Sequence, residues 1–328
     1  MESVDKKSSD IGQIIEAPNT DSSKDTWVKS YNDRASAALS KPNTWLPLVY
    51  QKANSNKVET QYNDWLLSAD TREILESVTP STCQVLDFIL VQAQKQRNKT
   101  IKFTRRDFLS ARGISDKDKN NTQLRDGIET LFSISLKFFL PNPSRKRRKN
   151  RAEAALEALA SREFRIIQER METKSGSPLI TVVLSDRFYE YLMSLPPSNY
   201  PSPLLKCDPR TNSYNLGRKL WEHWAMGRNA TIISVASLLA SCGIPTYASA
   251  DAKTRKHYDR TIAFFIRDMD RNKDIYSWTF CLEKSAPLPS GFRVLPSNFH
   301  TLYISYKMIY SASNNEIIDI QPEGKVLA

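Results

Sequence analysis

The sequence predicts an α+β fold of two tandem winged-helix units, each a helix-turn-helix followed by a β-hairpin wing, behind an N-terminal arm. Two observations predict it: one block of sequence occurs twice, and segments with strand-like alternation of apolar and polar residues follow each copy. A Pro-rich stretch, residues 195–203, predicts a rigid hinge between the units. The predicted organisation is an arm over residues 1–78, a first unit over 79–200, a second over 201–318 and a tail over 319–328.

The repeated block reads FTRRDFLSARGIS at residues 103–115 and ISVASLLASCGIP at residues 233–245. Each copy has a Thr or Ser that can cap a helix, then a pair of apolar residues, then Gly-Ile. Thr and Ser favour helix N-caps, and Gly commonly ends a helix. The next predicted helix of each copy carries apolar residues at i, i+4, i+7 and i+8, which form one helical face. These residues are Leu124, Ile128, Leu131 and Phe132 in the first copy, and Tyr258, Ile262, Phe265 and Ile266 in the second. The alternative is two helical subdomains with coincidental spacing.

The remaining elements follow from caps and alternation. Thr79 before Pro80 predicts the start of the first helix, because Pro fits the first helical position. In the first unit, one helix is predicted to start at residue 80, and others are predicted at 104–112, at 119–133 and, after the basic run, at 152–160. Strands are predicted there at 100–103, 136–140, 164–172 and 179–184. In the second unit, helices are predicted at 214–226, 234–241 and 252–269, with strands at 231–233, 275–282 and 302–310 and a wing loop at 287–296.

Charge is distributed unevenly along the chain. Residues 1–80 hold nine Lys and Arg against twelve Asp and Glu, whereas the rest of the chain holds 38 against 24. A basic body indicates a polyanionic partner. Residues 1–26 are rich in Ser, Asp and Lys and are predicted to be disordered, and residues 27–76 are predicted to form a partly helical arm.

Several classes of protein are disfavoured. The four cysteines lie far apart, without a Cys-x-x-Cys pair, and the chain has three histidines, so we expect neither a zinc site nor a disulfide scaffold. The N-terminus lacks the apolar core of a signal peptide, and no apolar run reaches the length of a membrane span. We therefore expect a cytoplasmic protein with reduced thiols, no cofactor and no membrane partner.

The third helix of the second unit carries the clearest candidate DNA-binding face. In a helix-turn-helix, the N-terminal turns of this helix enter the major groove. The face opposite its apolar residues carries cations that suit phosphate and guanine contacts. These candidates are Lys253, Lys256, His257 and Arg260; the alternative is a solvated charged face.

The first unit offers a less basic face at the equivalent positions, with Lys119, Thr122, Gln123 and Asp126. Gln123 could read adenine and Asp126 could accept from cytosine, although an acidic residue repels phosphate. Two other basic groups are candidates for phosphate contacts. They are Arg105 and Arg106 at the start of the second helix, and Arg145, Lys146, Arg147, Arg148 and Lys149 in the run RKRRKNR, which also resembles a nuclear localisation patch and could equally be a solvated loop.

No catalytic constellation is evident, so we expect a non-enzymatic protein. The sequence has no Gly-x-x-x-x-Gly-Lys-Ser/Thr phosphate loop and no His-x-His motif. The pair Asp268 and Asp270 is of the kind that two-metal enzymes use, but it lies at the end of the candidate recognition helix.

With both copies aligned, the chain resembles plasmid replication initiator (Rep) proteins built from two winged-helix domains. The resemblance covers residues 79–318 and is carried by the repeated block, by LSDRFYEYL at 184–192, and by YPSPLLKCDPRTNSYNLGRKLWEH at 200–223. In the last stretch, Leu205, Asp208 and Arg210 match the family's Leu-x-x-Asp-x-Arg pattern.

The resemblance implies binding to origin repeats (iterons), local opening of the duplex, recruitment of host replication proteins, and copy control through self-repression by a homodimer. The alternatives are a winged-helix transcriptional regulator, a primase-like or transposase-like enzyme, and a basic protein that recognises no DNA sequence.

Overall fold

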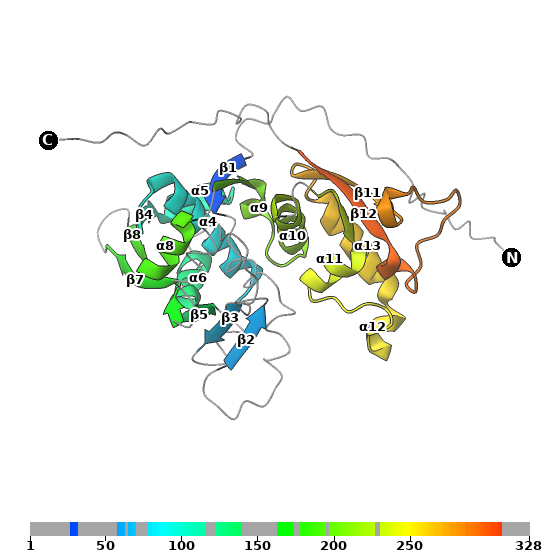
Figure 1. Ribbon diagram of the computed structural model, residues 1–328, viewed down its shortest axis with the longest axis horizontal. Helices are drawn as coiled ribbons and strands as arrows, with labels where there is room; N and C mark the ends of the chain where they lie inside the picture. The colour runs from blue at the N-terminus through cyan, green and yellow to red at the C-terminus, as the bar shows by residue number, and fades with distance from the viewer. Residues whose placement is uncertain are drawn as a thin grey trace, which may run out of the picture.

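The computed structural model describes residues 27–31, 58–62, 65–69, 78–115, 122–138, 163–173, 178–194, 197–226 and 230–309. These residues form helices and small antiparallel sheets, so the predicted α+β class is confirmed. Elements from α4 (Pro80–Gln96) to α8 (Asp186–Ser194) lie together on the left of Figure 1. Those from α10 (Ser213–Met226) to β12 (Tyr303–Met308) lie on the right, and α9 (Pro203–Lys206) lies between the two groups. None of the described helices combines the length and the apolar character that a membrane span needs.

The first group begins at α4, and its start is set by the predicted cap. The Thr79 hydroxyl accepts from the backbone N–H of Thr82, and the Thr82 hydroxyl accepts from the backbone N–H of Thr79, which is a capping box. The elements are α4 (Pro80–Gln96), β4 (Thr100–Thr104), α5 (Arg105–Ala111), α6 (Gln123–Phe132), β5 (Ile134–Phe138), β6 (Glu163–Arg165), β7 (Ile167–Glu172), β8 (Leu179–Leu184) and α8 (Asp186–Ser194).

The second group repeats this order from α10 onward. Ser234 caps its short helix, accepting from the backbone N–H of Ser237 at 3.2 Å, as Thr104 caps α5. The elements are α10 (Ser213–Met226), β10 (Ile232–Ser234), α11 (Val235–Ser241), α12 (Ala252–Lys256), α13 (Tyr258–Asp270), β11 (Tyr276–Cys281) and β12 (Tyr303–Met308).

Each group contains a three-stranded sheet, and the two sheets have the same strand order. β8 lies between β4 and β7, and β12 lies between β10 and β11. In both sheets, the first strand precedes the short capped helix and the other two strands follow the next long helix. Buried cross-strand pairs, Ile101 with Val182 and Ile233 with Ile304, belong to the core. The repeat therefore extends beyond the block that the sequence reveals.

The turn after the short helix is also the same in both groups. Gly113 has a φ of +65° and Gly243 a φ of +69°, a conformation that Gly adopts without strain. The N–H of the Ile that follows each glycine donates to a leucine carbonyl five residues earlier, at 2.9 Å and 3.0 Å. This Schellman pattern ends the short helix and turns the chain toward the next one.

The predicted apolar faces form the core in both groups. The buried residues make one cluster that continues from α4 through α9 to β12. The three leading members of each predicted face are buried and the fourth is half-buried: Leu124, Ile128, Leu131 and Phe132 on α6, and Tyr258, Ile262, Phe265 and Ile266 on α13.

Strands form the described parts of the arm and of the Pro-rich stretch. Every described residue between positions 27 and 76 is in a strand, and the rest of that range lies outside the described residues. Residues 197–201 of the Pro-rich stretch form a paired strand where a rigid hinge was predicted, and a sheet edge tolerates proline because the missing N–H can face away from the partner strand. β1 (Trp27–Tyr31) pairs with β9 (Pro197–Pro201), and α9 (Pro203–Lys206) follows β9. β2 (Val58–Tyr62) and β3 (Trp65–Ala69) belong to a four-stranded sheet with the order β2-β3-β5-β6. Residues 1–26, 152–160 and 319–328 lie outside the described residues.

Two predicted elements are divided. The strand predicted at 164–172 is two strands, because β6 pairs with β5 whereas β7 pairs with β8. The helix predicted at 252–269 is interrupted at His257, whose φ of −120° and ψ of 20° are not helical. The predicted wing loop at 287–296 packs partly on the core through Leu288, Phe292 and Val294.

Replacing Gly113 with Ala tests the shared turn. We expect the free energy of unfolding to fall by about 1–2 kcal/mol, because an L-residue is strained at this φ. The added Cβ would lie 3.7 Å from the nearest atom of Lys206, so a steric clash contributes nothing. Urea unfolding of the full chain measures the change, and an unaltered midpoint would contradict the left-handed turn.

Candidate nucleic-acid interface and the junction behind it

The predicted cationic face lies on α12 and the first turn of α13. Lys253, Lys256, His257 and Arg260 are all exposed. Because the chain breaks at His257, Lys253 and Lys256 come from α12 and Arg260 from α13, rather than all from one continuous helix. The backbone N–H of Thr254 donates to the Asp251 carboxylate at 2.6 Å, which caps α12 and lowers the pKa of Asp251.

Buried contacts hold this face outward. The Tyr258 hydroxyl donates to the Pro245 carbonyl at 2.9 Å, and its ring packs edge-on against Tyr247. Arg255 Nε donates to the Ala250 carbonyl at 2.8 Å, so this cation fixes the loop before α12. Because Ile262 and Phe265 are also buried, the side of α13 that carries Arg260 faces solvent.

The equivalent face of the first group is engaged within the protein. Arg112 Nη1 donates to the Gln123 side-chain oxygen, so the adenine-reading oxygen predicted there already has a donor. The Thr122 hydroxyl donates to the Asp126 carboxylate at 2.6 Å. Arg106 is exposed and Arg105 is half-buried at the start of α5. Lys119 and the basic run Arg145, Lys146, Arg147, Arg148 and Lys149 lie outside the described residues.

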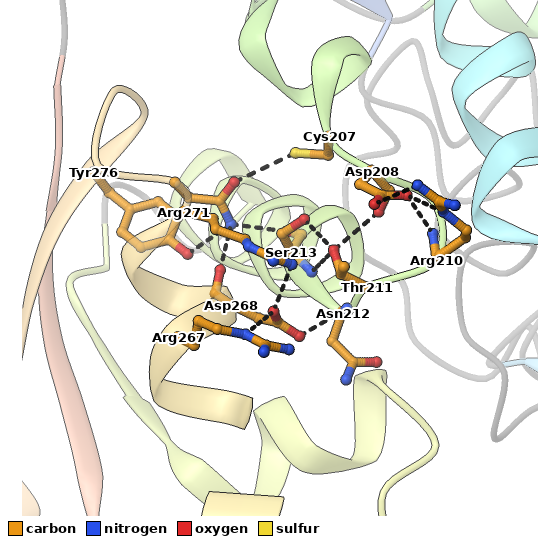
Figure 2. Close-up of polar contacts among 11 residues, drawn as sticks. Cys207, Asp208, Arg210, Thr211, Asn212, Ser213, Arg267, Asp268, Arg271 and Tyr276 are labelled. Carbon is orange, nitrogen blue, oxygen red and sulfur yellow. Dashed lines mark hydrogen bonds and ion pairs between the residues drawn. The ribbon is translucent and has the colours of Figure 1, made fainter. Parts of the chain in front are cut away.

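The two carboxylates Asp268 and Asp270 serve different partners, as Figure 2 shows for Asp268. The buried Asp268 carboxylate accepts from the backbone N–H of Asn212 at 3.1 Å and pairs with Arg271 at 3.1 Å. Asp270 accepts from the indole N–H of Trp278 at 3.1 Å. Within the described residues, no group of three or more His, Cys, Asp or Glu could hold a metal ion.

The family-pattern residues lie in the segment that enters α10. Arg210 donates to both carboxylate oxygens of Asp208, at 3.1 and 3.3 Å, and these bonds lower the pKa of Asp208. Leu205 is buried. The Asn272 side chain donates to the Ser213 carbonyl at 2.8 Å and accepts from the Cys207 thiol at 3.4 Å, which ties the end of α13 to the start of α10.

A buried ion-pair network joins the two groups. Asp87 on α4 pairs with Arg218 on α10, and both side chains are 2% exposed. The hydroxyls of Tyr200 and Tyr214 donate to the Asp87 carboxylate at 2.7 and 2.9 Å. Arg218 Nε donates to Glu222 at 3.2 Å. Burial acts to lower the pKa of Arg218, but Asp87 and its other partners outweigh burial and hold that pKa well above its ordinary value.

Two further side chains of the first group bind the backbone of the segment that connects the two groups, between Leu204 and Cys207. The Gln84 amide donates to the carbonyls of Leu204 at 3.1 Å and Cys207 at 2.9 Å. Arg112 Nε donates to the Leu205 carbonyl at 3.1 Å, and burial lowers the pKa of Arg112. Arg112 therefore connects this segment to Gln123 on α6. Sequence reasoning missed the network, although Asp87 among the apolar residues of α4 was a signal of a buried partner.

Comparisons with known proteins give low similarities. No protein-family model matches the chain, and no curated protein matches it. The chain is similar to a crystal structure of selenomethionine derivatives of domains 2 and 3 of RctB, with 13% identity, a TM-score of 0.42, and coverage of 81% of this chain and 98% of that one. A second structure of RctB domains 2–3 gives 15% identity, a TM-score of 0.41, and coverage of 79% and 93%. TM-scores this low do not establish a common fold.

Replacing Arg218 with Met tests the junction. We expect a loss of about 3–5 kcal/mol in the free energy of unfolding, because Asp87 would stay buried without its cation. Combining it with Asp87→Asn should cost less than the sum of the single changes, since the buried charge is also removed. Urea unfolding gives the four values of this cycle. Lys99→Met, which breaks the exposed pair of Lys99 with Asp186, is the control and should change little. Additive single effects would contradict the coupling.

Proposed function

We propose that the chain binds duplex DNA with sequence specificity through two winged-helix domains, and that it acts as a plasmid replication initiator. One observation carries the proposal: the same order of helices, turn and three-stranded sheet occurs twice, and the second copy turns an exposed cationic helix face outward. A helix-turn-helix with a strand pair behind it is the arrangement that places a third helix in the major groove.

In this proposal, α11 crosses the DNA backbone and the α12–α13 face enters the groove. Lys253, Lys256, His257 and Arg260 contact phosphates and base edges. In the first domain, α5 supplies phosphate contacts and α6 reads bases. The first-domain residues are Arg105, Arg106, Lys119, Thr122 and Gln123, and the basic run of Arg145, Lys146, Arg147, Arg148 and Lys149 adds non-specific phosphate contacts.

The buried junction supports a composite DNA site. Because Asp87, Arg218 and Gln84 join α4 to α10 and to the connecting segment, the two domains are held in one relative orientation. Two reading helices on a fixed frame suit one contiguous site, and repeated copies of that site suit an origin with iterons. In the proposed role, the protein also opens the origin, recruits host replication proteins and represses its own gene as a homodimer.

Opening of an origin distinguishes an initiator from a transcriptional regulator. On a supercoiled plasmid that carries the DNA flanking the gene, we expect the protein to make thymines beside its binding repeats reactive to permanganate. A relaxed plasmid is the control, because melting is favoured by negative supercoiling. Specific binding without permanganate reactivity would contradict initiation and favour a regulator. Mg²⁺-dependent turnover that is lost in Asp268→Ala and Asp270→Ala variants would favour an enzyme.

Specific and non-specific contacts should respond differently to mutation. Arg260→Ala should cost roughly 1–3 kcal/mol of binding to the specific site and little on random duplex. Neutralising the five residues Arg145 to Lys149 should weaken binding to all duplexes alike and reduce its salt dependence. Electrophoretic shifts with specific and scrambled duplexes, over a series of salt concentrations, measure both effects. Equal effects of the two variants on both duplexes would contradict this division.

A further inference from the structure

The outer face of α13 carries a large apolar side chain. Phe264 is 50% exposed, although the opposite side of the same helix buries Tyr258, Ile262 and Phe265. Arg260 and Arg267 lie four residues before and three after it, so all three share the outer face. An exposed phenylalanine lacks the stabilisation that burial gives, so a partner that covers the ring would gain that stabilisation.

The surroundings of Phe264 indicate the chemistry of that partner. The Arg267 guanidinium lies over the Phe264 ring, 4.7 Å from its centroid. Arg260 and Arg271 are also exposed on this side of the helix, and Lys253 and Lys256 precede it on α12. The apolar ring thus lies within a cationic face, which complements a polyanion that presents an apolar group rather than a second apolar protein surface.

We propose that Phe264 contacts the C5 methyl group of a thymine in the major groove and so determines part of the DNA sequence that the chain binds. The thymine methyl is the apolar group that duplex DNA displays in this groove, and phenylalanine is among the side chains that contact it. Arg267, whose guanidinium lies over the ring, then lies beside the phosphates. This inference rests on the proposed DNA binding and deepens it.

Substitution of deoxyuridine for thymine tests the contact, because it removes the methyl group and nothing else. A specific duplex is first selected from a random pool with the full chain, and its thymines are then replaced one at a time. For the wild type, we expect one position at which affinity falls roughly fourfold, which is what burial of one methyl group supplies. Phe264→Ala should bind the thymine duplex about that much more weakly and show no further loss with deoxyuridine.

Two variants sharpen the test. Phe264→Leu keeps an apolar side chain and should retain most of the sensitivity to deoxyuridine. Leu295→Ala removes a side chain that is 49% exposed elsewhere on the same group of elements, and it should leave both affinities unchanged. Circular dichroism of each variant verifies that it is folded.

Equal sensitivity to deoxyuridine in the wild type and in Phe264→Ala would overturn the thymine contact while leaving the proposed DNA binding intact. Loss of self-association in Phe264→Ala on sedimentation, with unchanged DNA affinity, would also overturn it and assign the face to contact between copies. Failure of the wild type to select any duplex sequence would instead refute the proposed function, and this contact with it.

Discussion

Asp87 and Arg218 form a buried ion pair between α4 and α10, the first helices of the two groups. Moving two charges out of water is costly, and the pair is stable only where hydrogen bonds satisfy the remaining lone pairs and protons. Tyr200, Tyr214 and Glu222 supply those bonds. The network holds the two helices together, and the apolar core likewise runs without interruption from one group to the other.

The junction also engages the start of α6, whereas the α12–α13 face stays exposed. Arg112 links the connecting segment to Gln123, so the start of α6 is already engaged inside the protein. On the α12–α13 face, the cations and Phe264 are exposed to solvent. The Asp251 cap and the hydrogen bond from Tyr258 to the Pro245 carbonyl fix the backbone beneath them.

Local signals account for the parts of the fold that were predicted correctly. Thr79, Thr104 and Ser234 cap the helices that they were expected to cap, and Gly113 and Gly243 end theirs. Each signal depends on a few neighbouring residues, whose hydrogen bonds and backbone angles are decided within one turn. The exposure of Arg260 followed from the spacing of the apolar residues opposite it on α13, whereas Lys253 and Lys256 are exposed on α12, which buries no residue.

The sequence by itself determined where helices start, where they end and which of their faces is apolar, because caps, glycines and periodicity act over a few residues. Only the tertiary structure decided the pairing of β1 with β9 and the partner of Asp87. It also decided the use of Gln123 by Arg112 and the break at His257. The strand pairing and the partner of Asp87 involve residues that are distant in the chain. The break at His257 interrupts a segment whose local sequence favours a continuous helix. The free energy that selects them therefore comes from burial and hydrogen bonding in the assembled fold rather than from any single segment.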